Sequence, residues 1–234
     1  MPRHSVLLGI FLCLFFLRAP LFALEPWEAA LAKMPLKTNV TELGRYDYIP
    51  LLVESFQEND AAKALIFMPG ATDEFYFFRR AHATLTNSAP TVLDALRALT
   101  NQSLVRVTFR APYILVHSNE DPLEPFYNVN SETKVDQLVK RKFIRHVVYN
   151  DRDWNSLRPT LAFELDTKIL PASGSWESNH FYRHSFAAWN LNDFEILEVM
   201  AFAGKTTFTI DQRKIIFEGD KRFRARPPVP DFSK

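Results

Sequence analysis

The chain has 234 residues, of which 47% are hydrophobic and 14% aromatic, and its formal net charge at pH 7 is +1. This composition is ample for a packed core, and a total of only 6 glycines argues against low-complexity linkers. The near-neutral charge does not by itself predict a partner.

The first residues have the order of a secretory signal peptide. A basic region, Met1 to His4, precedes the apolar run "SVLLGIFLCLFFL" and then "RAPLFA", which ends at the small residue Ala23. This order predicts a signal peptide at residues 1–23 and an exported protein, periplasmic or secreted. The apolar run is shorter than the ~20 residues that span a bilayer, so no membrane span is expected after cleavage. An uncleaved anchor is the alternative.

Cleavage would change the chemistry available to the mature chain. The only cysteine, Cys13, lies inside the apolar run, so disulfides and thiol catalysis are excluded after cleavage. The loss of Arg3 and Arg18 takes two of the 28 basic residues and leaves all 27 acidic ones, for a formal charge of −1.

Residues 24–62 are predicted to be an N-terminal helical segment. In "EPWEAALAKMPL" the apolar residues Trp27, Leu31 and Met34 have helical spacing, and Pro35 stops the helix. A second helix is expected to begin at Pro50 and to continue through "LLVESFQEND".

Residues 63–117 are predicted to form a first α+β unit. The expected order is a buried strand (Ala64 to Phe67), the segment "FFRRAHATLTN", a helix (Thr91 to Thr100) and two strands (Leu104 to Phe109 and Tyr113 to His117).

Residues 118–158 differ in character and are interpreted as a basic connector. The stretch "KVDQLVKRKFIRH" carries the positive side chains Lys134, Lys140, Arg141, Lys142, Arg145 and His146. These could attract an anionic polymer or a lipid surface. Neighbouring Asp151 and Asp153, together with export away from nucleic acid, favour a solvated helix face. No nucleic-acid partner is expected.

Residues 159–219 are predicted to form a second α+β unit, followed by a Pro-rich tail at 220–234. The expected order is a strand (Leu161 to Leu165), the segment "FYRHSFAAWNLN", a helix (Phe194 to Ala203) and two strands (Thr207 to Ile210 and Lys214 to Phe217).

The two units predict an internal duplication. Leu93, Leu96, Ala98 and Leu99 of the first helix align with Ile196, Val199, Ala201 and Phe202 of the second, and each set lies on one helical face. The predicted fold class is therefore α+β, with two similar small units of strand, helix and β-hairpin. The alternative is that any helix followed by a hairpin gives such an alignment.

Two aromatic-basic blocks are the candidate contact residues. Flat rings and guanidinium groups suit protein interfaces, although internal packing is an equal alternative. The blocks are Phe77, Phe78, Arg79 and Arg80 in the first unit, and Phe181, Tyr182, Arg183 and His184 in the second.

The segments "VLDALRALTNQSLVRVTF" and "ILEVMAFAGKTTFTI" each place a helix before a β-hairpin with an aliphatic strand. This pattern resembles the short N-terminal domain found in secretins and TonB-dependent receptors. The resemblance covers about 30 residues in each half, and it implies a small α+β module that makes protein contacts in the envelope.

Two enzyme interpretations remain as alternatives. "YILVHSNEDPLEP" resembles the acid-bearing strand end of α/β-hydrolases, with Asp121 as the acid and His146, His180 or His184 as histidine candidates. A Gly-x-Ser-x-Gly elbow is missing, and Ser173 and Ser175 lack a strand and helix around them.

His180 and His184 have the four-residue spacing of metal ligands on a helix, with Glu177 nearby. Structural histidines are the favoured interpretation, so no metal and no cofactor are predicted. The sequence therefore predicts an exported, non-enzymatic binding or scaffold protein of a bacterial envelope, with an envelope protein as its partner. The alternative is a hydrolase-like or metal-dependent enzyme.

Overall fold

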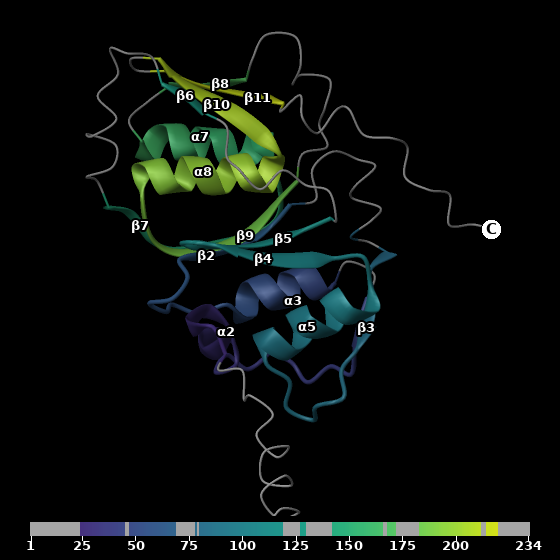
Figure 1. The fold of residues 1–234 in the computed structure, drawn as a ribbon. Coiled ribbons are helices and arrows are strands. Elements are labelled where there is room, and N and C mark those ends of the chain that lie inside the picture. The colour runs from purple at the N-terminus through teal and green to yellow at the C-terminus, as the bar shows by residue number, and fades with distance from the viewer. Residues whose placement is uncertain are drawn as a thin grey trace, which may run out of the picture.

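The computed structural model describes residues 24–44, 47–68, 78, 80–118, 127–129, 142–165, 168–171, 183–211 and 214–219. The fold is α+β, as predicted. Its elements form four layers: helices, a five-stranded sheet, a second layer of helices, and a four-stranded sheet (Figure 1).

The five-stranded sheet lies between two hydrophobic cores. Its strand order is β4 (Arg106–Arg110), β5 (Tyr113–His117), β2 (Ala64–Phe67), β9 (Arg183–Asn192) and β7 (Lys142–Asp153). β2 is parallel to β5, and the other neighbours are antiparallel. All four residues of β2 are buried, because helices cover both faces of the sheet there. This confirms the buried strand predicted at 64–67.

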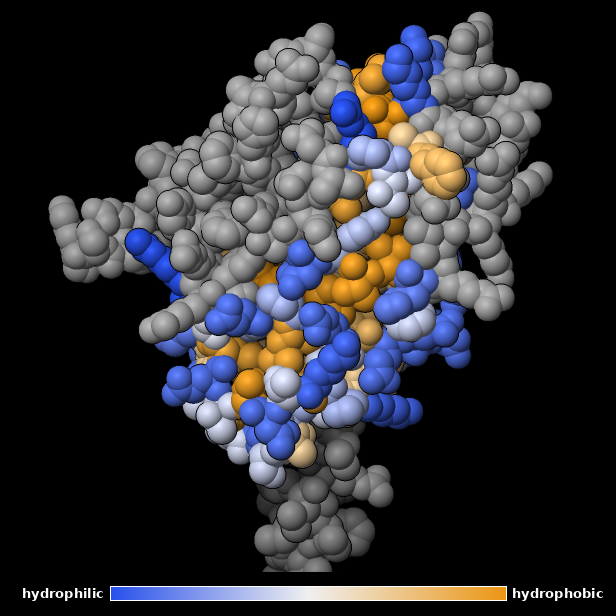
Figure 2. Space-filling view, turned by 180° about the vertical axis from the view of Figure 1, so that it is seen from behind, coloured by the Kyte–Doolittle hydropathy of each residue, from blue (hydrophilic) through white to orange (hydrophobic). Residues whose placement is uncertain are grey.

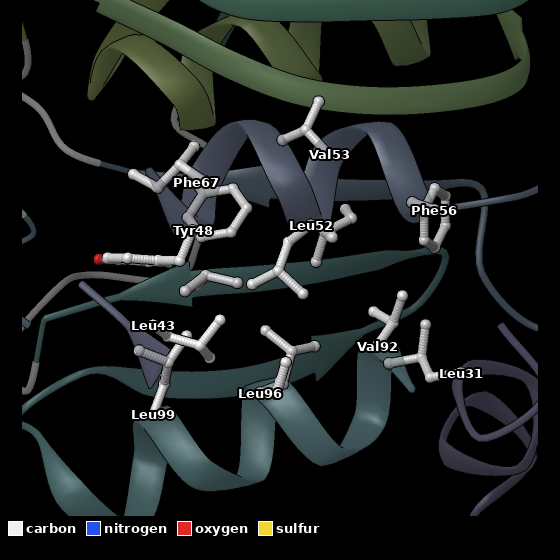
Figure 3. Close-up of a cluster of buried hydrophobic side chains, with 14 of the residues drawn as sticks. Leu31, Leu43, Tyr48, Leu52, Val53, Phe56, Phe67, Val92, Leu96 and Leu99 are labelled. Atoms are coloured by element: carbon white, nitrogen blue, oxygen red, sulfur yellow. The ribbon is translucent and has the colours of Figure 1, made fainter. Parts of the chain in front are cut away.

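The first core lies between the sheet and three helices, α2 (Pro26–Leu31), α3 (Tyr48–Ser55) and α5 (Val92–Gln102). Leu65 and Phe67 of β2 point into this core, while Ala64 and Ile66 point into the other one, as the alternation of a strand requires. Figure 3 shows Phe67 and Leu52 opposite Leu96 and Leu99 of α5. A two-stranded sheet, β1 (Glu42–Leu43) with β3 (Ala83–Thr84), lies at the margin.

The predicted helices of the first half are confirmed with shifted ends. The helix expected from Pro50 begins at Tyr48 and ends at Ser55. α5 begins at its N-cap Thr91, whose hydroxyl accepts a hydrogen bond from the Asp94 amide, while the Asp94 side chain bonds back to the Thr91 backbone. This capping box satisfies amides that the first turn leaves without helical partners.

The second core lies between the five-stranded sheet and a four-stranded sheet, with α7 (Trp154–Glu164) and α8 (Asp193–Gly204) in between (Figure 1). The four-stranded sheet has the order β6 (Tyr127–Val129), β10 (Thr206–Asp211), β11 (Lys214–Gly219), β8 (Lys168–Pro171). Because α8 meets a sheet on each side, it is buried almost all round, including Leu197, Val199 and Phe202.

The strand predicted at Leu161 to Leu165 is wrong, because these residues belong to α7 and the turn that follows it. Leu157, Leu161 and Leu165 recur every four residues and are all buried in the second core. This spacing places them on one helical face. Pro159 lies inside the helix and obscures that pattern in the sequence.

The prediction that residues 118–158 form a connector is also wrong for those of them that the structure describes. Residues 142–153 form β7, the longest strand, and residues 127–129 form β6. Val147 points into the second core and Val148 packs against the first, so this stretch is a component of the sheet. Lys142, Arg145 and His146 thus lie on a strand rather than on a helix face, whereas Lys134, Lys140 and Arg141 are outside the described residues.

The predicted duplication does not hold in the described residues. Both halves contain a helix followed by a hairpin, α5–β4–β5 and α8–β10–β11. The first hairpin joins β2 in the five-stranded sheet, whereas the second lies in the other sheet between β6 and β8. The counterpart of β2 in the second half is helical. The alternative, local similarity of any helix and hairpin, is the one found.

Hydrophobic residues also reach the surface. Seen from behind, they form a band across the middle of the molecule, flanked by hydrophilic residues (Figure 2). Within the described part of the chain, no helix combines the length and the apolar character needed to cross a membrane.

Candidate functional site

The predicted contact residues are only partly described. Phe77, Arg79, Phe181 and Tyr182 lie outside the described residues. Arg80 is exposed, whereas Phe78 is fully buried, with its ring edge-on to that of Phe67 at 6.4 Å between centroids. The Phe78 backbone oxygen also accepts a 2.8 Å hydrogen bond from the Tyr48 hydroxyl. Phe78 therefore packs internally, which is the alternative that the sequence left open, and it is not a surface contact.

Of the second block, Arg183 and His184 belong to β9. The backbone of Arg183 lies opposite that of Asp153 in the antiparallel neighbour β7, and the next residue, His184, is fully buried. A Cβ on Gly204, the last residue of α8, would lie 2.8 Å from the His184 Nε2 atom, so the helix end and the ring are in close contact. His184 thus supports the packing of α8 on β9, and it too is not a surface contact.

Most residues of the two enzyme alternatives lie outside the described part of the chain. These are Asp121, Ser173, Ser175, Glu177 and His180. Among the described residues, no group of three histidine, cysteine or acidic side chains is placed to hold a metal ion.

The remaining histidine candidate, His146, is exposed and stacks on Trp189 at 3.8 Å between ring centroids. Partial desolvation of the imidazole, followed by the Lys37 charge, lowers the pKa of His146.

A polar cluster lies where α8 crosses the ends of β5 and β2. The Tyr113 hydroxyl donates a 2.7 Å hydrogen bond to Glu198, and the Arg110 guanidinium lies 5.5 Å from the centre of the Phe202 ring. Beside them, Lys63 forms an ion pair with Glu195. Burial raises the pKa of Glu198, although the Tyr113 bond and the Arg110 charge oppose this effect. Burial and the Glu198 charge also raise the pKa of Tyr113, which keeps the hydroxyl protonated as a donor.

We expect this cluster to make stability depend on pH. Because the folded pKa of Glu198 lies above its ordinary value of 4.5, its contribution to stability is most favourable below that pH and is lost as the pH rises through the folded pKa. Glu198→Gln keeps an acceptor for Tyr113 and removes the charge, so the variant should gain stability relative to the parent protein as the pH rises.

Urea denaturation between pH 4 and pH 8 measures this difference. Glu218→Gln, at an exposed position of β11, controls for the loss of one charge. A Glu198→Gln difference that is constant across this range would contradict the assigned role of burial.

The β4 edge is a second feature with chemical character. β4 pairs only with β5 among the described strands, and all five of its residues remain in register. Arg106, Thr108 and Arg110 lie opposite His117, Leu115 and Tyr113, which places them on the face of the sheet that α8 covers. The Thr108 hydroxyl lies 2.9 Å from His117 Nε2.

The other face of β4 is apolar. Val107 and Phe109 pack against the first core, and the Phe109 ring stacks on Trp27 of α2 at 5.7 Å with an interplanar angle of 12°. Leu104, just before the strand, is 48% exposed. The β4 edge, residues 106–110, therefore presents basic and polar side chains on one face and apolar side chains on the other.

Sequence reasoning placed a strand here but did not identify a site. The alternation of basic or polar with apolar residues in "RVTFR" was the available signal. The sheet order, which makes β4 an edge, depends on pairing between segments far apart in the chain.

Comparisons with models of protein families, with curated proteins and with solved structures found no match to this chain.

Proposed function

We propose that the protein is an exported, non-enzymatic binding component of a bacterial envelope, and that it holds a partner protein at the β4 edge. Export is inferred from the predicted signal peptide at residues 1–23. The binding role is inferred from the resemblance of residues 92–109 to envelope interaction domains. That segment includes α5 and most of β4.

The observation that carries the proposal is the regularity of β4 at the margin of the sheet. An edge strand directs about half of its backbone N–H and C=O groups away from its neighbour, and an extended segment of another protein can pair with them. The other edge, β7, has register shifts at Lys142/Ile144 and at Tyr149/Arg152. Such irregularities discourage pairing with another strand, so β4 is the better docking edge.

Site-specific photo-crosslinking in the native cell tests the proposal. A photoreactive residue at Thr108 is expected to give an adduct with an envelope protein after fractionation. The same residue at Thr209, which is half-buried on β10, serves as the control position. Retention of the protein in the cytoplasm, or equal adducts from both positions, would refute the proposal.

A further inference from the structure

We propose that the β4 edge recognises an extended acidic segment in which two acidic residues, four positions apart, enclose apolar residues at the second and fourth positions. This inference rests on the proposed binding function and specifies the chemistry of the partner. In an antiparallel arrangement, the first and fifth residues of the added strand would lie opposite Arg110 and Arg106, and the third opposite Thr108.

On the face of the sheet that α8 covers, charge complementarity favours acidic residues in the partner segment. Arg106 and Arg110 occupy the two ends of β4 on the same face, and directly opposite charges stabilise a strand pair. The carboxyl of Glu198 already contributes a favourable charge interaction at Arg110. Arg106 is exposed at the other end of the strand.

On the other face of the sheet, the apolar side chains of β4 favour apolar residues in the partner segment. Residues opposite Val107 and Phe109 would extend the margin of the first core, where both side chains are only partly buried. The stacked ring of Trp27 continues this apolar surface from α2. An added strand with its acidic residues shifted by one position would direct them to this apolar face and lose both kinds of contact.

A second copy of the chain does not fit the same edge. Antiparallel pairing of two β4 strands over their whole length, centred on Thr108, would place Arg106 of each copy opposite Arg110 of the other. Like charges directly opposite each other are destabilising, so self-pairing is disfavoured and a different, acidic segment is the expected occupant.

Three synthetic peptides test the recognition rule with the full mature protein. The cores are Glu-Val-Thr-Val-Glu, the basic analogue Lys-Val-Thr-Val-Lys, and Val-Glu-Thr-Glu-Val, which has the composition of the first peptide in the shifted register. We expect the first peptide to bind about tenfold more tightly than either of the others, measured by fluorescence anisotropy at low salt. Equal binding of the acidic and basic peptides, or no binding of the first, would overturn the inference.

A charge exchange separates recognition from folding. Arg106→Glu should weaken binding of the acidic peptide and should restore binding of Glu-Val-Thr-Val-Lys, whose last residue lies opposite position 106. Lys214→Glu, at an exposed position of the four-stranded sheet, is the matched control and should leave both affinities unchanged. Equal effects of the two variants would indicate general electrostatic attraction and would refute the assigned register.

Backbone methylation of the acidic peptide tests strand addition itself. Methyl groups on the amides of one edge of the peptide should abolish binding, whereas the same number on the amides of the other edge should leave it intact. Loss in both cases, or in neither, would refute pairing with β4.

The outcomes for the chemistry and for the function are distinguishable. A Thr108 adduct in cells together with no preference among the peptides would refute the acidic rule and retain the binding function. Selective peptide binding without any adduct in cells would retain the acidic rule and refute the binding function.

Discussion

Val199→Asp is expected to unfold the protein, with a loss of more than about 4 kcal/mol in the free energy of unfolding. Val199 is fully buried on α8, with a sheet on either side of the helix. A carboxylate at this position can neither reach water nor find a basic partner in a core built from apolar side chains. Circular dichroism and urea denaturation of the purified variant measure the loss.

Leu96→Asp on α5 tests the other core in the same way. Leu96 is 1% exposed, but α5 has only one buried face, so a small displacement of the helix can bring the carboxylate nearer to water. We therefore expect a loss of several kcal/mol that is no larger than that of Val199→Asp. Asn101→Asp, on the exposed face of α5, is the control and should change stability by less than about 0.5 kcal/mol. A stably folded Val199→Asp variant would contradict the central position of α8.

Phe78→Ala is expected to cost about 3–5 kcal/mol of stability through the loss of a buried ring. The ring contacts Phe67 in the first core, while the hydrogen bond from Tyr48 goes to the backbone and survives the change. The loss should appear as a lower urea midpoint with an unchanged slope.

Arg80→Ala provides the comparison, because its side chain is exposed and was assigned to the same block in the sequence. This variant should keep its stability within about 0.5 kcal/mol of the parent protein. If Phe78 were a surface contact, Phe78→Ala would instead keep its stability and lose partner binding.

Local patterns in the sequence predicted much of the first half. Leu93, Leu96 and Leu99 recur at helical spacing and are buried on one face of α5. The apolar run at 64–67 predicted a buried strand correctly, and this strand is β2 in the middle of the five-stranded sheet. These patterns succeed because each face of these elements meets only one kind of environment, either the core or the solvent.

The second half shows why local patterns do not suffice. α8 is buried on most of its surface because two sheets enclose it, which removes the contrast between faces that marks a surface helix. The leucines of α7 were assigned to a strand because Pro159 interrupts the helical pattern. The burial of His184 depends on Gly204, twenty residues later, so an aromatic-basic stretch gave no sign of it.

The claim that β4 is the binding edge is tested most directly by hydrogen–deuterium exchange in the intact protein, with and without the Glu-Val-Thr-Val-Glu peptide. Amides that gain a partner strand exchange more slowly. The peptide is expected to slow exchange in residues 106–110 of β4 and to leave residues 142–153 of β7 unchanged. Protection of β7, or no protection of β4 at peptide concentrations that saturate binding, would contradict the proposed binding edge.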